Sequence, residues 1–325
     1  ICGILGLPNV GKSTLFNAIT KSAIPAENFP FCTIEPNLGI VNVPDNRLQM
    51  IDKIAHSKKV IPTTMSFVDI AGLVKGASKG EGLGNAFLSN IREMNALLHV
   101  VRCFDDENVV HVDGKIDPIS DLETINLELI FADIEVLDKR LIKLEKLIRA
   151  GDPQAQKDQS IIFSLKKMME SGALPNLDGY DEEEKDFIQS LTLLSTKPML
   201  LIANLSDDKS KNKLEELEEY AAANSINIIP AVVKIEHELA NLEEEEQREY
   251  LNVQIKCHNV VLATTRRAVI YTLNFTAKTY LFGPSTSQKV IKTSQKNLLH
   301  LSERAGRPTC KMGSTFPRNR RGVCR

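Results

Sequence analysis

The segment Gly6–Ser13, which reads GLPNVGKS, constrains the fold of this chain more than any other feature. It matches the pattern G-x-x-x-x-G-K-[S/T], in which glycines let successive backbone N–H groups point at phosphate oxygens. The apolar run Cys2–Leu7 leads into it, and the helical stretch Thr14–Thr20 follows it. The sequence therefore predicts a strand, a phosphate-binding loop and a helix whose positive dipole end faces the anion.

Residues of this loop are expected to contact a nucleoside triphosphate and its Mg²⁺ ion. Lys12 would place a point charge on the β- and γ-phosphates, which makes it a predicted catalytic residue. The hydroxyl group of Ser13 is placed to bind Mg²⁺. The other nucleotide-binding residues predicted in the loop are Asn9, Val10, Gly11 and Thr14.

Two further segments fit the same site. The apolar stretch Ser66–Asp69 reads as a strand that ends in an acid, and D-x-x-G continues it to Gly72. We expect Asp69 to hold Mg²⁺ through water and the N–H group of Gly72 to meet the γ-phosphate. Thr33 lies in the loop between the two motifs and is the candidate for the second protein ligand of Mg²⁺.

A fourth motif follows the apolar run that ends at Asn204. Guanine-nucleotide switches read N-K-x-D at this point, but here Leu205 replaces the lysine, while the acid is kept as Asp207. Val233 lies in the segment AVVK, which replaces the S-A-K that usually surrounds guanine. Asn204, Leu205, Asp207 and Val233 are therefore the predicted base-binding residues. Since guanine loses contacts, we predict a preference for ATP over GTP.

The arrangement of apolar runs predicts an α/β fold. Short apolar runs alternate with helical stretches, as in a doubly wound, mostly parallel sheet. The predicted strands are Cys2–Leu7, Ser66–Asp69, Ala96–Arg102, Met199–Asn204 and Ile226–Val233.

The alternation stops between about residues 117 and 197. Apolar residues there recur at spacings of three and four, which predicts a helix with a coiled-coil seam. The seam residues are Ile130, Ile134, Leu137, Leu141, Leu144 and Ile148. Gly151–Pro153 ends this helix, and the helical stretch Gln159–Glu170 can pack back against it. We predict an inserted antiparallel helical arm whose seam packs on itself rather than on a partner.

The balanced net charge of −2 conceals an asymmetry. Residues 256–325 contain 14 basic residues and one acid, a charge of 14 − 1 = +13, while residues 1–255 contain 26 basic and 41 acidic residues, 26 − 41 = −15. A basic end on an acidic body indicates a polyanionic partner, nucleic acid first. A solvated or disordered tail is the equal alternative.

Composition also argues against several classes of protein. No apolar run approaches the roughly 18 residues of a membrane span. The six cysteines form no C-x-x-C pair, which argues against a zinc site or a disulfide framework and fits a reducing compartment. The chain begins at Ile1 rather than Met, so we expect its natural start to be missing, and nothing there resembles a secretory signal.

Several segments together resemble the Obg-like ATPase (YchF) subfamily of translation-factor-class P-loop NTPases. They are GLPNVGKST, NFPFCTIEPN, DIAGLVKGASKGEGLGN, VVRCF and KIEHEL, and the resemblance covers about residues 1–251. It implies a cytosolic protein that binds Mg²⁺-nucleotide, prefers ATP and associates with ribosomes. It also implies a C-terminal TGS domain, a β-grasp-like fold linked to RNA binding.

The resemblance divides the chain into three predicted parts. Residues 1–116 and 198–255 would form the nucleotide-binding domain, and residues 117–197 the coiled-coil arm. Residues 256–325 resemble a TGS domain only in fragments, so we expect either a small β-rich TGS-like domain that is divergent and truncated or an end that does not fold as a TGS domain. The family usually has Glu where this chain has Asp207, which makes the base preference less secure.

The resemblance also bears on hydrolysis. Small GTPases carry a water-orienting glutamine where this chain has Leu73, so hydrolysis must depend on another group or on a partner. His111 is the predicted proton acceptor, and a surface residue without a catalytic role is the alternative. Relatives with P-N-V-G-K-S imply that Asn9 binds a monovalent cation such as K⁺, and a turn residue is the equal alternative.

The function favoured by these features is that of a Mg²⁺-dependent ATPase, slow without a partner, that acts as a nucleotide-dependent switch on ribosomes or RNA. One alternative is a GTPase of the same architecture, supported by Asp207. The other is a nucleotide-gated ribosome- or RNA-binding module with incidental hydrolysis, supported by Leu73 and the basic end.

Overall fold

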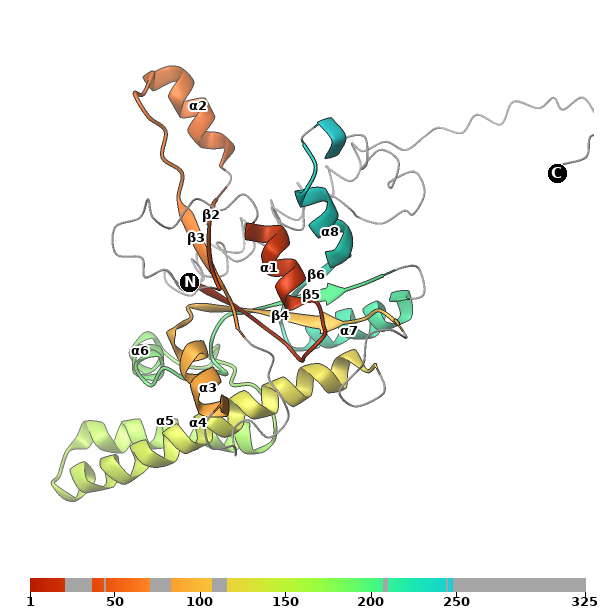
Figure 1. Cartoon of the computed structure of the whole chain (residues 1–325). Helices are drawn as coiled ribbons and strands as arrows, with labels where there is room; N and C mark the ends of the chain where they lie inside the picture. Colours follow the sequence, from red (N-terminus) through yellow and green to blue (C-terminus); the bar gives the residue numbers. More distant parts are fainter. Residues whose placement is uncertain are drawn as a thin grey trace, which may run out of the picture. The chain divides into compact units, whose positions relative to one another are not determined.

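The computed structural model describes residues 1–20, 37–43, 45–70, 83–106, 116–206, 210–243 and 245–247. Its centre is a six-stranded sheet with the strand order β2-β3-β1-β4-β5-β6 (Figure 1). The chain divides into two units, residues 1–281 and 282–325, and all described residues belong to the first.

The predicted mostly parallel sheet is confirmed. Its strands are β1 (Cys2–Leu5), β2 (Leu38–Asn42), β3 (Thr64–Asp69), β4 (Ala96–Arg102), β5 (Met199–Asn204) and β6 (Asn227–Ala231). All neighbouring strands pair in parallel except β2, which pairs antiparallel with β3 at the edge of the sheet. Strand β2 was not predicted from the sequence, because its segment, LGIVN, is short and contains a glycine, a residue depleted in strands.

Helices cover both faces of the sheet, so the predicted doubly wound arrangement is also confirmed. The helices are α1 (Lys12–Thr20), α2 (Asn46–Ala55), α3 (Leu83–Glu93), α4 (Pro118–Arg149), α5 (Pro153–Glu170), α6 (Glu182–Ser190), α7 (Lys211–Ala223) and α8 (Val233–Ala240). Figure 1 shows α1 and α8 on one side of the strands and α3, α4 and α7 on the other.

Strand β4 runs through the middle of this core. All seven of its residues are buried, which is typical of a strand covered by helices on both faces. Its neighbours β1 and β5 are also buried over all or nearly all of their length, and together these strands bring the phosphate-binding loop and the end of β5 to one edge of the sheet. Ligands of such folds bind at this carboxyl edge.

The predicted pair of long helices is present as α4 and α5. An apolar cluster between them is separate from the sheet core and includes Leu137, Leu141 and Leu144 of α4 and Ile162 and Leu165 of α5. The N-terminal part of α4 instead belongs to the sheet core, through its apolar side chains at positions 125, 129 and 132. One continuous helix of 32 residues therefore serves two cores.

Helix α5 begins six residues earlier than predicted, at Pro153 rather than Gln159 (159 − 153 = 6). The carboxylate of Asp152 caps it by accepting hydrogen bonds from the backbone N–H groups of Gln154, at 2.9 Å, and Ala155, at 3.4 Å. Proline is favourable at the first helical position because its missing N–H group has no partner there. The cap at Asp152 therefore sets the start of α5 at Pro153, whereas the spacing of apolar residues alone predicted a later start.

Asp133 joins α4 to the chain that enters β5. Its buried carboxylate accepts hydrogen bonds from the backbone N–H of Leu194 at 2.8 Å and from the N–H and Oγ of Ser195, both at 2.7 Å. Burial raises the pKa of Asp133, and the three donors oppose that shift. Just beyond, Lys197 donates to the carbonyl oxygens of Arg92 and Met94, which ties the same connection to the end of α3.

The predicted domain boundaries and the predicted TGS-like region concern residues that lie partly outside the described ranges. The C-terminal residues 248–325, with the predicted TGS-like region, are among them, and the domain boundaries stay predictions. Cys2 and Cys103 are buried free thiols. None of the helices in the described part of the chain is both long and apolar enough to cross a bilayer.

Candidate functional site

The phosphate-binding loop has a backbone that demands glycine at two positions. Gly6 has φ 150° and Gly11 has φ 101°, in the region that L-residues with a Cβ rarely occupy. A Cβ on Gly6 would lie 2.5 Å from the carbonyl oxygen of Val100, and one on Gly11 would lie 2.5 Å from Nδ2 of Asn204. Asn9 also has a positive φ, 62°, which asparagine tolerates better than most residues.

Lys12 is the first residue of α1, and its side chain folds back over the loop. Only 8% of the residue is exposed, and its Nζ donates a hydrogen bond of 2.8 Å to the carbonyl oxygen of Leu7. Burial lowers the pKa of Lys12, and the nearby carboxylate of Asp69 partly opposes the shift. The structure therefore brings a buried cation to the loop that the sequence predicted to bind phosphate.

Asp69 is the last residue of β3, and it pairs in register with Ile4 of β1, immediately before the phosphate-binding loop. Its Oδ1 is buried and has no hydrogen-bond partner among the described residues. An unpaired buried carboxylate oxygen is costly, so its environment is suited to a cation. Ser13, next to Lys12 at the start of α1, is exposed, and its hydroxyl group is another of the predicted Mg²⁺ ligands.

These residues fit a Mg²⁺ ion bound together with phosphate. Mg²⁺ prefers oxygen ligands, and it usually takes only one or two from the protein, leaving the rest to water and substrate phosphates. The Ser13 hydroxyl and the unpaired Asp69 oxygen are ligands of this kind. No group of three or more His, Cys, Asp or Glu side chains within the described ranges forms a separate metal centre.

The side chain of Asn204, at the end of β5, links the phosphate-binding loop to α8. Its Nδ2 donates to the carbonyl oxygen of Val10 at 2.9 Å, and its Oδ1 accepts from the backbone N–H of Val233 at 3.2 Å. Four predicted nucleotide-binding residues, Val10, Gly11, Asn204 and Val233, therefore meet around one buried amide. Each end of an amide has capacity for a further hydrogen bond, so the expected contact of Asn204 with adenine stays a prediction.

Leu205 follows Asn204 and continues the edge of this site. Its backbone N–H donates to the carbonyl oxygen of Ala231 at 2.8 Å, and its half-buried side chain packs against the apolar cluster between β4, β5 and α7. The residue that replaces the lysine of guanine-binding relatives is therefore held at the carboxyl edge of the sheet by a backbone bond.

The structure brings together part of the predicted site and leaves the rest untested. Thr14 is half-buried in α1, and Asn9 is exposed in the loop. Other predicted residues lie outside the described ranges, so their assigned roles stay predictions. They are Thr33, Gly72, Leu73, His111 and Asp207.

His99 is a buried residue near the site that the sequence analysis missed. It lies in β4, in register with Leu5, and its Nδ1 has no hydrogen-bond partner among the described residues. Burial, with a smaller contribution from the charge of Lys12, lowers the pKa of His99 to about 3. The only signal in the sequence was a histidine inside an otherwise apolar run that ends in Arg102.

Comparison with known proteins identifies relatives over most of the described part. A family model described as 50S ribosome-binding GTPase matches residues 1–133. The ribosome-binding ATPase YchF of Bacillus subtilis (strain 168) is 49% identical over 254 residues, which cover 77% of this chain and 69% of that protein. The protein of the same name from Escherichia coli O157:H7 is 46% identical over 252 residues, with the same coverage of each chain.

A solved structure gives the same result in three dimensions. The Schizosaccharomyces pombe YchF GTPase superposes with a TM-score of 0.69 at 35% sequence identity, covering 84% of this chain and 74% of that one. A second family model, the T4-like virus Myoviridae tail sheath stabiliser, matches residues 219–312. The described part of that range includes β6, a strand of the six-stranded sheet, and α8, a helix that lies on one side of this sheet.

Proposed function

Because the chain belongs to the YchF family of Obg-like P-loop ATPases, we propose that it is a Mg²⁺-dependent ATPase that binds ribosomes and changes its affinity for them with the bound nucleotide. The observation that carries this proposal is the buried Lys12 in a glycine-dependent loop beside the unpaired carboxylate oxygen of Asp69. A ribosome-bound protein of this kind would act in the cytoplasm.

The chemistry would be transfer of the γ-phosphoryl group of ATP to water, giving ADP and inorganic phosphate. Lys12 would hold the β- and γ-phosphates and stabilise their charge, while Ser13, Asp69 and Thr33 would hold Mg²⁺. The ion, when bound, would neutralise charge on the phosphate oxygens. Burial favours this arrangement because electrostatic interactions are stronger where water is excluded.

The water molecule needs a group that accepts its proton. Leu73 cannot do so because its side chain is apolar, and we assign the role to His111. The N–H group of Gly72 would contact the γ-phosphate, so that the loops containing Gly72 and Thr33 would change with the nucleotide. Asn9, which is exposed in the phosphate-binding loop, is the proposed ligand of a K⁺ ion.

The preference for ATP follows from what the base site lacks. Leu205 has no charged stem to cover a guanine, and Asn204, which we propose to bind adenine, is oriented by Val10 and Val233. Asp207 would instead favour guanine, because guanine-nucleotide switches have Asp at this position of the motif. A GTPase of the same architecture is the second candidate, because the matching family model and the fission-yeast relative are both described as GTPases.

A competition titration separates these candidates. ATP and GTP would compete for the purified protein in the presence of Mg²⁺, and we expect ATP to bind more tightly. Lys12→Ala should lower the hydrolysis rate by about 100-fold or more, a typical loss for one electrostatic contact in a transition state. Lys53→Ala, which changes an exposed lysine of α2, is the control.

Two results would contradict the proposal. Tighter binding of GTP would favour the second candidate. Ribosome association that is the same with ATP, with ADP and in Lys12→Ala would exclude a nucleotide-dependent switch.

A further inference from the structure

Helix α4 carries a row of lysines on the face turned away from α5. Lys139, Lys143 and Lys146, here called the outer lysine row, are spaced by four and three residues and therefore share one side of the helix. The opposite side holds Leu137 and Leu144, which pack against α5. A rise of 1.5 Å per residue makes the row about 10 Å long.

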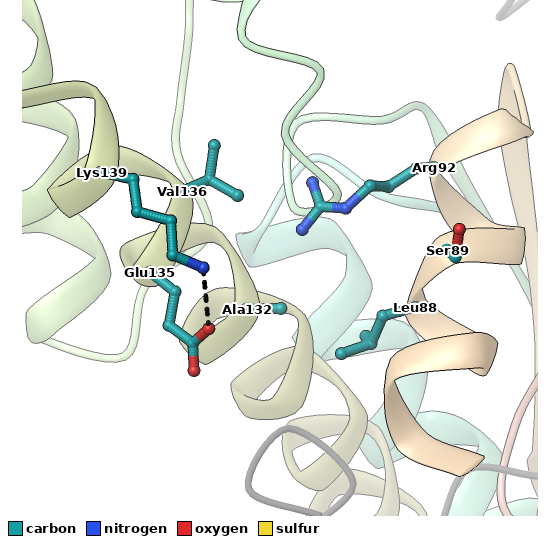
Figure 2. Close-up of a pocket in the computed structure, with 7 residues that line it drawn as sticks. All are labelled: Leu88, Ser89, Arg92, Ala132, Glu135, Val136 and Lys139. Atoms are coloured by element: carbon teal, nitrogen blue, oxygen red, sulfur yellow. Dashed lines mark ion pairs between the residues drawn. The ribbon is translucent and has the colours of Figure 1, made fainter. Parts of the chain in front are cut away.

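The row begins at a groove between α4 and α3. Figure 2 shows this groove, a cavity of about 160 Å³, with the guanidinium group of Arg92 pointing from α3 toward α4. Ser89 of α3 and Lys139 of α4 also line it. At the inner end of the row, the polar lining of the groove therefore consists of one hydroxyl group, two cationic side chains and the carboxylate of Glu135.

The cations of the row are weakly neutralised. Lys139 is 76% exposed and lies 3.8 Å from Glu135, which is 62% exposed, so this ion pair contributes little. Lys143 and Lys146 are exposed and have no ion pair within the described ranges.

Of the nearby acids on α4, Asp138 is engaged by Lys166 of α5 at 2.6 Å. Glu145 lies 4.0 Å from Arg149, and this exposed ion pair also contributes little. The row is therefore a local concentration of positive charge on a body whose residues 1–255 carry 41 acids against 26 bases.

Such a row fits phosphates better than a protein surface. The centres of protein interfaces are depleted of lysine and enriched in aromatic residues, and no aromatic side chain lies on α4 between Lys139 and Lys146. Exposed lysines neutralise nucleic-acid phosphates and release their counterions. The guanidinium group of Arg92 can hold a phosphate through two parallel hydrogen bonds.

We propose that the outer lysine row and Arg92 bind the phosphate backbone of RNA. The inference rests on the proposed ribosome binding, because that function supplies ribosomal RNA as the polyanion. It assigns one surface to that contact, on the arm helix and next to α3, which follows the D-x-x-G segment in the chain.

The test compares two double variants of the full chain. Lys143→Glu with Lys146→Glu changes the row, and Lys157→Glu with Lys167→Glu changes two exposed lysines of α5. Both lower the net charge by 4 (two changes from +1 to −1). The probe is a fluorescently labelled single-stranded RNA of mixed sequence, titrated by anisotropy at several salt concentrations.

We expect the row variant to lose about 10-fold or more in RNA affinity, while the α5 variant stays within about 2-fold of the unchanged chain. The slope of log affinity against log salt should fall by about 1.4 for two lost contacts with a single strand, at about 0.7 each. Arg92→Lys keeps the charge and should weaken binding while leaving the slope unchanged. Equal losses in the two double variants, or no loss in the row variant, would overturn the inference.

Two further measurements identify the partner and separate this inference from the proposed function. In the first, poly-L-glutamate and unlabelled RNA compete with the labelled RNA. If the two competitors displace it equally, the outer lysine row binds acidic proteins and the inference is contradicted. Sedimentation with ribosomes is measured on the same variants. If the row variant still sediments fully with ribosomes, this inference is contradicted but the proposed function is not. If the unchanged chain does not sediment with ribosomes, the proposed ribosome binding is contradicted, and the RNA titration alone then tests the outer lysine row.

Discussion

At the scale of single residues, buried polar groups around the phosphate-binding loop hold it in place. The amide of Asn204 pairs with two backbone groups that the fold would otherwise leave unsatisfied, those of Val10 and Val233. His99 does the opposite, because its Nδ1 is buried without a partner in the described part of the chain. One residue therefore stabilises the site, and the other makes it sensitive to acid.

Asn204→Ala should lower the free energy of unfolding by about 2–4 kcal/mol, because each of the two buried backbone groups it leaves unpaired costs about 1–3 kcal/mol. Urea denaturation measures this loss. The control Asn224→Ala removes an exposed asparagine whose Nδ2 donates to Tyr220 at 2.9 Å, and it should cost under about 1 kcal/mol. Equal losses of unfolding free energy in both variants would show that the two hydrogen bonds of Asn204 do not stabilise the fold more than an exposed one does.

His99 should make the protein less stable in acid. Its pKa lies near 3 in the folded chain and near 6.5 when unfolded, so below pH 6.5 only the unfolded chain binds this proton. The penalty is absent above pH 6.5 and grows by about 1.4 kcal/mol per pH unit as the pH falls toward 3.

His99→Leu keeps a similar volume and removes the titrating group. Between pH 6.5 and 5.0, its free energy of unfolding should fall by about 2 kcal/mol less than that of the unchanged chain, as measured by urea denaturation at each pH. His56→Asn, at an exposed left-handed position that asparagine tolerates, controls for the loss of one histidine. The same pH dependence with and without His99 would refute the prediction.

At the scale of elements, α4 determines how the arm is attached. The first half of the helix packs on the sheet, the second half packs on α5, and the carboxylate of Asp133 lies between the two contacts. Its three hydrogen bonds position the chain segment that enters β5, the strand that ends in Asn204.

Asp133→Ala should therefore lower the free energy of unfolding by about 3 kcal/mol or more, because it leaves the buried donors of Leu194 and Ser195 unpaired. Asp138→Ala on the same helix removes a carboxylate that is 49% exposed and paired with Lys166, so it should cost under about 1 kcal/mol. Chemical denaturation of the two variants provides the comparison. A larger loss in the Asp138 variant would contradict the proposed link.

At the scale of the whole molecule, nucleotide binding should stabilise the fold because the site is assembled from distant parts of the chain. Lys12, Asp69 and Asn204 come from α1, β3 and β5, so unfolding destroys the site. The acidic body also confines favourable contacts with polyanions to local basic surfaces such as the outer lysine row.

ATP with Mg²⁺ at 100 times its dissociation constant should raise the free energy of unfolding by about 2.7 kcal/mol. Thermal unfolding with and without nucleotide detects this increase. EDTA should remove most of it, because Ser13 and Asp69 are expected to hold the ion, and Lys12→Ala should show little. An increase that persists in full with EDTA would contradict the assignment of the metal ligands.

Local patterns in the sequence predicted much of the fold and part of the site. The glycines at positions 6 and 11 were evident from the motif because a phosphate-binding loop is a short-range backbone shape. The buried strands were evident from their apolar runs, and the seam of the arm from its spacing. The start of α5 at Pro153 was misplaced because the apolar pattern was followed rather than the capping residue Asp152.

The sequence by itself determined most of the strands, the two long helices and the residue types of the phosphate-binding loop, because backbone conformation and helix or strand periodicity depend on near neighbours. Only the tertiary structure decided that Asn204 pairs with Val10, 194 positions away, and that Asp133 holds Ser195, 62 positions away. Such contacts depend on how strands and helices are brought together by burial of apolar surface, and no local pattern records them.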